Sequence, residues 1–78
     1  MHGEFHEIIG RVRRNKGITQ RQAATDLGAS QARFSHYERG IREPDLAFLA
    51  RLCDYYDISA DVLLGRAPYI VPDHQVNV

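Results

Sequence analysis

The stretch that decides the fold is TQRQAATDLGASQARFSHYERGIREP, residues 19–44. A short side-chain oxygen at a helix N-cap accepts a hydrogen bond from an unpaired backbone N–H, and a glycine can take the left-handed conformation that ends a helix. The stretch offers these residues in the alternating order Thr19, Gly28, Ser30, Gly40. The order predicts two short helices, at about residues 20–27 and 30–39, joined by a tight turn.

Two details refine this helix pair. Gln22 lies three residues after Thr19, the spacing of a capping box in which each residue's side chain bonds the other's backbone. Phe34 and Tyr37 lie three residues apart and therefore on the same helix face. We expect these two aromatic side chains to anchor the second helix of the pair, which leaves its opposite face exposed.

Three more helices are expected around the pair. An apolar stripe of helical period, Phe5, Ile9 and Val12, predicts a helix over about residues 4–16. Pro44 suits the first turn of a fourth helix, whose inward stripe is Leu46, Leu49, Leu52, Cys53 and Tyr56. A last short helix follows an expected N-cap at Ser59, carries Val62, Leu63 and Leu64, and is closed by Gly65 and Pro68.

No segment shows a convincing alternation of apolar and polar residues with the period of a β-strand, so we expect the fold class to be all-α. A chain of 78 residues builds a single core. We divide it into a helical domain at residues 1–65 and a C-terminal tail at residues 66–78.

Composition excludes several classes of protein. Hydrophobic residues make up 44% and charged residues 26% of the chain, as in an ordinary globular domain. No apolar run has the length of a membrane span, and no secretory signal precedes the first helix. A single cysteine cannot form a disulfide within the chain. We expect a cytoplasmic protein without a membrane role.

The charges are unevenly distributed although the net charge is zero. Residues 1–42 hold eight Lys or Arg and four Asp or Glu, which gives a net charge of +4. Residues 43–78 hold two Lys or Arg and six Asp or Glu, which gives a net charge of −4. This polarity suits a molecule that turns one face toward phosphate, although chance segregation explains it equally well.

Catalysis and metal binding find little support. Ser35 and His36 are neighbours on a helix, so their side chains diverge and cannot act as nucleophile and base. Cys53 belongs to an apolar stripe, where a small buried hydrophobe is expected. His2 and His6 are four residues apart but have no third ligand nearby. We expect that the protein is not an enzyme and that it binds neither a metal ion nor a cofactor.

Five fragments carry a family resemblance through their joint spacing: RNKGITQ (14–20), LGAS (27–30), FSHYERG (34–40), REP (42–44) and DISADVLLG (57–65). The chain resembles the phage repressor and Cro family of helix-turn-helix regulators, also called the xenobiotic-response-element family. The resemblance covers about residues 5–65 and implies a compact five-helix fold like that of lambda repressor. Ala23 replaces a usual leucine and Phe34 a usual isoleucine, and this pair of changes conserves core volume.

The resemblance implies that the third helix enters the major groove of double-stranded DNA. Its early residues would then touch base edges; these are Gln31, Ala32, Arg33, Ser35 and His36. The side-chain chemistry agrees independently, since Gln can bond adenine N6 and N7, Arg can bond guanine O6 and N7, and Ala can contact the thymine methyl group. For Ser35 and His36 a merely solvated position remains open.

The family also implies phosphate contacts and a structural ion pair. Gln20 matches a phosphate-binding glutamine at a helix N-terminus, where the helix dipole is positive. The full set of expected phosphate contacts is Thr19, Gln20, Ser30, Arg39, Arg42, Arg11 and Arg14, the last two with less support than the others. Arg13 and Glu38 match positions that form a partly buried ion pair between the first and third helices.

Specific affinity usually needs two half-sites, because a single small module buries little surface on DNA. We therefore expect a homodimer on a near-palindromic operator, acting as a repressor, since repression requires only occupancy of a promoter. The expected dimer surface is Val62, Leu63, Tyr69, Ile70 and Val71, and Phe48 and Tyr55 could join it. The apolar tail could instead cover its own core.

Two other functions remain open. The protein could be an antitoxin or adaptor whose tail, too apolar for a plain disordered end, binds a partner protein. It could also be the DNA-binding part of a larger regulator, although the chain reads as complete and shows no effector domain.

Overall fold

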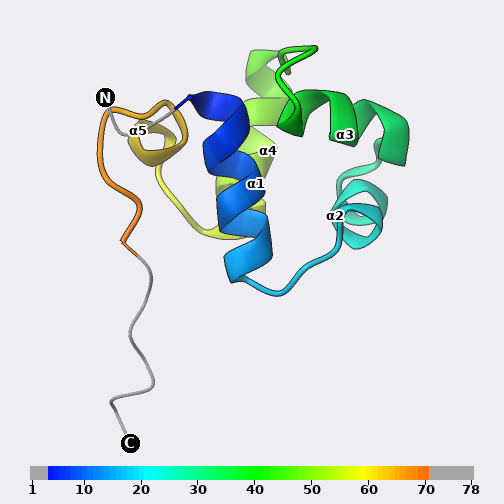
Figure 1. Cartoon of the computed structure of the whole chain (residues 1–78), viewed down its shortest axis with the longest axis horizontal. Coiled ribbons are helices and arrows are strands. Elements are labelled where there is room, and N and C mark those ends of the chain that lie inside the picture. The colour runs from blue at the N-terminus through cyan, green and yellow to red at the C-terminus, as the bar shows by residue number, and fades with distance from the viewer. Residues whose placement is uncertain (1–3, 71–78) are drawn as a thin grey trace, which may run out of the picture.

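The structure is a computed structural model in which residues 4–70 are described. Within this range the chain forms five α-helices and no strand: α1 Phe5–Asn15, α2 Gln20–Leu27, α3 Gln31–Glu38, α4 Leu46–Tyr56 and α5 Ala60–Leu63 (Figure 1). The predicted all-α fold with five helices is confirmed.

The helices surround one apolar core. In Figure 1, α1 runs down the front with α4 behind it, α2 and α3 lie together on one side, and α5 lies on the other. Each helix contributes buried side chains to the core, namely Ile8, Ile9, Val12, Ala23, Ala24, Leu27, Phe34, Tyr37, Leu52, Tyr56 and Leu63. Because Phe34 and Tyr37 are 0% and 2% exposed, they anchor α3 as the sequence predicts.

The predicted N-caps at Thr19, Ser30 and Ser59 are confirmed. Each hydroxyl accepts a hydrogen bond from the backbone N–H three residues ahead, at 3.0, 3.1 and 3.3 Å respectively. Gly28 ends α2 in the left-handed region, with φ of 73°. The capping box at α2 is only half formed, because the Gln22 side chain donates to Asp26 at 2.8 Å instead of returning to the Thr19 backbone.

The predicted start of the fourth helix is wrong. Helix α4 begins at Leu46, and Asp45 is its N-cap, with Oδ1 accepting from the Phe48 backbone N–H at 2.8 Å. Pro44 therefore precedes the cap and lies outside the first turn. An aspartate side chain is short enough to cap a helix, whereas Glu43, two residues earlier, has a longer side chain that caps poorly.

This shift changes which side chains of α4 face the core. Leu46, expected in the inward stripe, is 82% exposed because it is the first residue of the helix. Leu52 and Tyr56 are fully buried, while Leu49 and Cys53 are half-buried at the margin of the core. The inward stripe of α4 is therefore shorter than the sequence pattern suggests, and an exposed leucine remains at its beginning.

Candidate nucleic-acid interface

The first turn of α3 presents polar and small side chains on the surface. Gln31, Ala32 and Arg33 are exposed, while Ser35 and His36 are half-buried further along the helix. Ser30 caps the helix immediately before them, so the first turn is fixed in place. Gln31, Ala32 and Arg33 form the solvent-facing first turn of α3, whereas the core anchors Phe34 and Tyr37 follow later in the helix, so the N-terminal end of α3 is the part that a groove could accommodate.

Arg33 has a specific partner within the protein. Its Nε donates a hydrogen bond to the hydroxyl of Tyr37 at 2.8 Å, one turn further along α3. Its guanidinium carbon lies 6.0 Å from the centre of the Tyr37 ring, at the outer limit of a cation–π contact. The sequence pattern indicated Tyr37 only as an apolar anchor, although the i, i+4 spacing of Arg33 and Tyr37 is compatible with this hydrogen bond.

The expected phosphate-contacting residues outside α1 divide into three groups. Thr19 and Ser30 are exposed at the N-termini of α2 and α3, and Arg39 and Arg42 are exposed in the segment that follows α3. Gln20 differs, because it is half-buried and its Nε2 donates to Glu38 Oε1 at 3.0 Å. Its side-chain amide therefore joins α2 to α3, and its backbone N–H remains at the helix N-terminus.

Glu38 lies at the centre of a network that joins three helices. Arg13 on α1 donates from Nε to Glu38 Oε2 at 2.7 Å and from Nη2 to Oε1 at 3.2 Å, so the pair is bidentate. The same guanidinium donates from Nη1 to the Ile18 carbonyl at 2.8 Å, in the segment between α1 and α2. The side chains of Arg13 and Glu38 are only 12% and 6% exposed. The network fixes α1, α2 and the end of α3 relative to one another.

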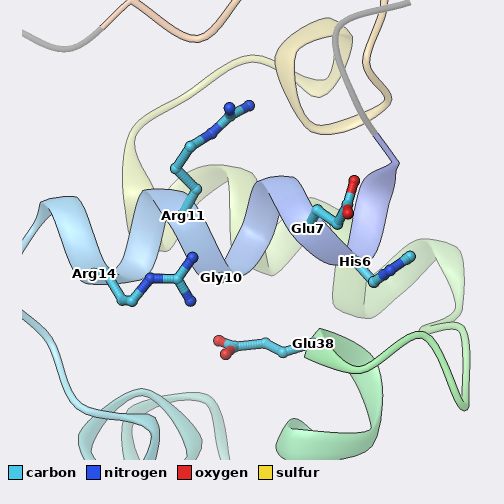
Figure 2. Close-up of a pocket in the computed structure, with 6 residues that line it drawn as sticks. All are labelled: His6, Glu7, Gly10, Arg11, Arg14 and Glu38. Atoms are coloured by element: carbon cyan, nitrogen blue, oxygen red, sulfur yellow. The ribbon is translucent and has the colours of Figure 1, made fainter.

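Arg11 and Arg14 lie on α1, around a surface pocket of about 440 Å³ that is also lined by His6, Glu7, Gly10 and Glu38. Figure 2 shows the Arg14 guanidinium and the Glu38 carboxylate pointing toward each other across Gly10, while Arg11 points away from them. A Cβ added at Gly10 would lie 3.1 Å from Arg14 Nη1 and 3.4 Å from Glu38 Oε1, so glycine permits this close approach. These two arginines thus belong to the surface of α1 beside the end of α3.

The dimer surface expected from the sequence requires correction at Leu63. Its side chain is 0% exposed and belongs to the core, so it cannot contact a second chain. Val62 is half-buried against the same core, and the Tyr69 hydroxyl donates to Asn15 Oδ1 at 2.9 Å, which ties the tail to α1. Ile70 is 77% exposed, and Val71 lies outside the described residues.

Phe48 and Tyr55 also have contacts within the chain. The Phe48 ring lies 5.1 Å from the Tyr37 ring, and the Tyr55 hydroxyl donates to Asp26 Oδ2. Burial, this hydrogen bond and the negative charge of Asp26 raise the pKa of Tyr55 to about 12. Both side chains therefore stabilise the packing of α4 on α2 and α3.

A different apolar surface is exposed. Leu46 at the start of α4 is 82% exposed and Leu64 after α5 is 41% exposed. The two leucines line a pocket of about 250 Å³, the remaining lining residues of which are Phe5, Glu43, Pro44 and Leu49. The pattern of the sequence did not indicate this surface, because Leu46 was assigned to the inward stripe of the fourth helix and Leu64 was assigned to the last helix without a role.

Other kinds of site find no support within residues 4–70. No group of three or more His, Cys, Asp or Glu side chains in that range could hold a metal ion. Burial, followed by the charge of Asp54, raises the pKa of the half-buried Cys53 thiol, which disfavours the reactive thiolate. None of the described helices is both long and apolar enough to span a bilayer.

Comparisons with known proteins agree with this geometry. The family model described as "Helix-turn-helix domain" matches residues 9–64. The HTH-type transcriptional regulator ImmR of Bacillus subtilis (strain 168) is 41% identical over 55 residues, covering 70% of this chain and 43% of ImmR. The HTH-type transcriptional regulator AnsR of the same organism is 38% identical over 55 residues, covering 70% of this chain and 47% of AnsR. A crystal structure of a transcriptional regulator from Listeria innocua superposes with a TM-score of 0.76 at 26% identity, over 99% of this chain and 72% of that one.

The chain therefore belongs to the helix-turn-helix family and is similar to its xenobiotic-response-element regulators, as the sequence predicts. This is a family of DNA-binding proteins and not of enzymes. The chain spans about half the length of the curated relatives it matches, between 43% and 56% of each.

Proposed function

We propose that the protein is a cytoplasmic transcriptional regulator that binds a near-palindromic DNA operator as a homodimer, with α3 in the major groove, and that it acts as a repressor. The observation that carries the proposal is the exposed first turn of α3, which is capped at Ser30 and anchored by the buried Phe34 and Tyr37. Occupancy of a promoter is sufficient for repression, so a protein that represses requires only a DNA-binding surface and no activation segment.

Base recognition falls to the exposed set at the start of α3. Gln31 offers the paired donor and acceptor that suit adenine, Arg33 the donors that suit guanine, and Ala32 a methyl contact for thymine. Ser35 and His36, which are half-buried, are the outer members of this set and contribute less.

Phosphate contacts would hold α3 in the groove. The exposed Thr19 and Ser30 lie at helix N-termini, where backbone N–H groups and the helix dipole favour an anion. Arg39 and Arg42 would meet the backbone beyond the end of α3. The backbone N–H of Gln20 would contribute, with its side chain occupied by Glu38. Arg11 and Arg14, around the α1 pocket, are the outermost members of the set.

Two copies are required to place two recognition helices about 34 Å apart along the duplex. The apolar surface of Leu46 and Leu64 is the part of the described chain best suited to join the two copies. Covering exposed leucine side chains with a partner removes apolar surface from water, which favours association. Ile70 is also exposed, at 77%, and belongs to the dimer surface expected from the sequence.

Selection of bound duplexes from a random pool tests the proposed DNA recognition. The expected result is enrichment of an inverted repeat whose half-sites are about one helical turn apart. A pool without enrichment would contradict sequence-specific binding, and an enriched single half-site would contradict the dimer.

Sedimentation of the purified protein with and without the Leu46→Glu substitution tests the proposed dimer surface. The wild-type chain should sediment as a dimer on operator DNA and the variant as a monomer. A matched Thr25→Glu variant, which changes an exposed residue of α2 outside the Leu46 pocket, should behave like the wild type. Co-purification of a stoichiometric unrelated chain would instead support the function of an antitoxin or adaptor.

A further inference from the structure

We propose that the Tyr37 hydroxyl positions the Arg33 guanidinium for base recognition, which makes Tyr37 a specificity-determining residue that does not itself touch DNA. The inference rests on the proposed function, because it assigns Arg33 to a base. It adds a residue that neither the exposed surface of α3 nor the family match identifies.

The acceptor in this pair is held rigidly by the core. Tyr37 is 2% exposed, and its ring lies 5.1 Å from the Phe48 ring at an interplanar angle of 47°. This tilted contact between α3 and α4 is one of the preferred arrangements of aromatic pairs. The buried ring therefore cannot turn freely, and its hydroxyl is a fixed acceptor next to the solvent-facing side of α3.

The donor, by contrast, is a long side chain on the exposed face. Arg33 Nε donates to the Tyr37 hydroxyl at 2.8 Å, which restrains a side chain that would otherwise sample many rotamers. Because Nε is used within the protein, Nη1 and Nη2 are the groups left to bond a guanine. Guanine presents O6 and N7 side by side in the major groove, so these two groups form a matching bidentate pair.

Restraint before binding improves affinity, because the entropy of ordering the arginine is lost during folding and not on the DNA. The same restraint improves discrimination. A guanidinium held in one orientation bonds poorly to a base that offers a different pattern of donors and acceptors, whereas a mobile one can adjust to it. The hydroxyl of Tyr37 thus acts on specificity through Arg33.

The Tyr37→Phe variant tests the inference, since it removes the hydroxyl and keeps the buried ring. We expect binding to the selected operator to weaken about 2- to 10-fold, the effect of freeing one long side chain. Binding to a random duplex should stay the same, and the preference for guanine at one position of each half-site should decline. In the Arg33→Ala background, the Tyr37→Phe substitution should cause no further loss of affinity.

The chain supplies a matched control in Tyr56. Its ring is also fully buried, but its hydroxyl has no hydrogen-bond partner within residues 4–70. The Tyr56→Phe variant should bind the operator and select bases as the wild type does. Equal losses for Tyr37→Phe and Tyr56→Phe would overturn the inference, because they would indicate a general effect on packing.

A measurement without DNA separates this inference from the proposed function. In the NMR spectrum of the free protein, the Arg33 Nε–H signal should exchange slowly with solvent, and this protection should disappear in Tyr37→Phe. Rapid exchange in the wild type would overturn the inference and leave the proposed function standing. A second outcome combines a protected Arg33 Nε–H in the wild type with an unchanged base preference in the Arg33→Ala variant. This outcome would remove Arg33 from the proposed base recognition and would overturn the inference as well.

Discussion

The two ends of α3 have opposite environments although they lie within one helix, Gln31–Glu38. At its start, Gln31 and Arg33 are exposed on the surface. At its end, the Glu38 side chain is 6% exposed and accepts three hydrogen bonds, two from Arg13 and one from Gln20. The helix is therefore held by its C-terminal end and presents its N-terminal end to solvent.

This difference separates two roles that mutations should be able to distinguish. A change at the Glu38 network should alter the stability of the whole domain and, through it, binding to every DNA sequence. A change at the first turn of α3 should leave stability alone and alter binding to particular sequences.

The Glu38→Ala substitution should destabilise the domain most. It leaves the guanidinium of Arg13, which is 12% exposed, without its carboxylate, and loss of one partner of a buried pair costs about 3 kcal/mol or more. Urea unfolding gives the free energy of unfolding. The control is Asp61→Ala, which removes an exposed ion pair with Arg66 at 4.0 Å and should cost less than about 1 kcal/mol. Similar losses for both variants would contradict the structural role of Glu38.

The Gln31→Ala substitution should act on binding and not on stability. We expect a loss of about 1–3 kcal/mol of binding free energy on the cognate operator, the range for one bidentate contact to a base. Binding to a random duplex should barely change, and the unfolding free energy should stay within about 0.5 kcal/mol of the wild type. Fluorescence anisotropy with both duplexes measures this. A uniform loss on both would show that Gln31 only contacts phosphate.

The Gln20→Ala substitution should combine both effects at a smaller size. Loss of the hydrogen bond to Glu38 should lower the free energy of unfolding by about 1 kcal/mol. Binding to all sequences should weaken similarly, because the start of α2 is less firmly held. Selection of bound duplexes with this variant checks the assignment. An altered base preference would contradict the role of Gln20 in phosphate contact and in the Glu38 network.

The smallest effect is expected for Tyr56→Phe, beside the Glu38 network. At neutral pH the variant should be as stable as the wild type or about 1 kcal/mol more stable, because the lost hydroxyl has no hydrogen-bond partner among residues 4–70. Burial, and next the charge of Glu38, raise the pKa of Tyr56, partly offset by Arg13.

The raised pKa predicts how stability depends on pH. Above pH of about 10 the unfolded tyrosine loses its proton first, so the unfolded state binds fewer protons and the domain is destabilised as pH rises. The Tyr56→Phe variant should lose less stability than the wild type between about pH 10 and 12. Unfolding curves across this range measure the difference, and identical slopes would contradict burial of the hydroxyl.

Local features of the fold were predictable from the sequence. The caps at Thr19, Ser30 and Ser59 depend on a hydroxyl and a backbone N–H three residues apart, and that geometry is contained in the sequence itself. The anchors Phe34 and Tyr37 follow from helical spacing in the same way. The Arg13 and Glu38 positions came from the family resemblance, since nothing local connects residues on α1 and α3.

The features that the sequence did not predict depend on where helices begin and how they pack. Helix α4 starts after Asp45, and this shift by two residues leaves Leu46 exposed. Leu63 was assigned to a dimer surface formed by the last helix and the tail, but in α5 its side chain packs into the core. The bond from Gln20 to Glu38 joins two helices, so only the tertiary structure reveals it.

The most direct test of the central claim repeats the selection of bound duplexes with Arg33→Ala and Gln31→Ala proteins and compares base preferences position by position with the wild type. The account predicts that each variant loses its preference at one or two positions of each half-site and keeps the others. An unchanged profile in both variants, with affinity merely reduced, would contradict base recognition by the first turn of α3.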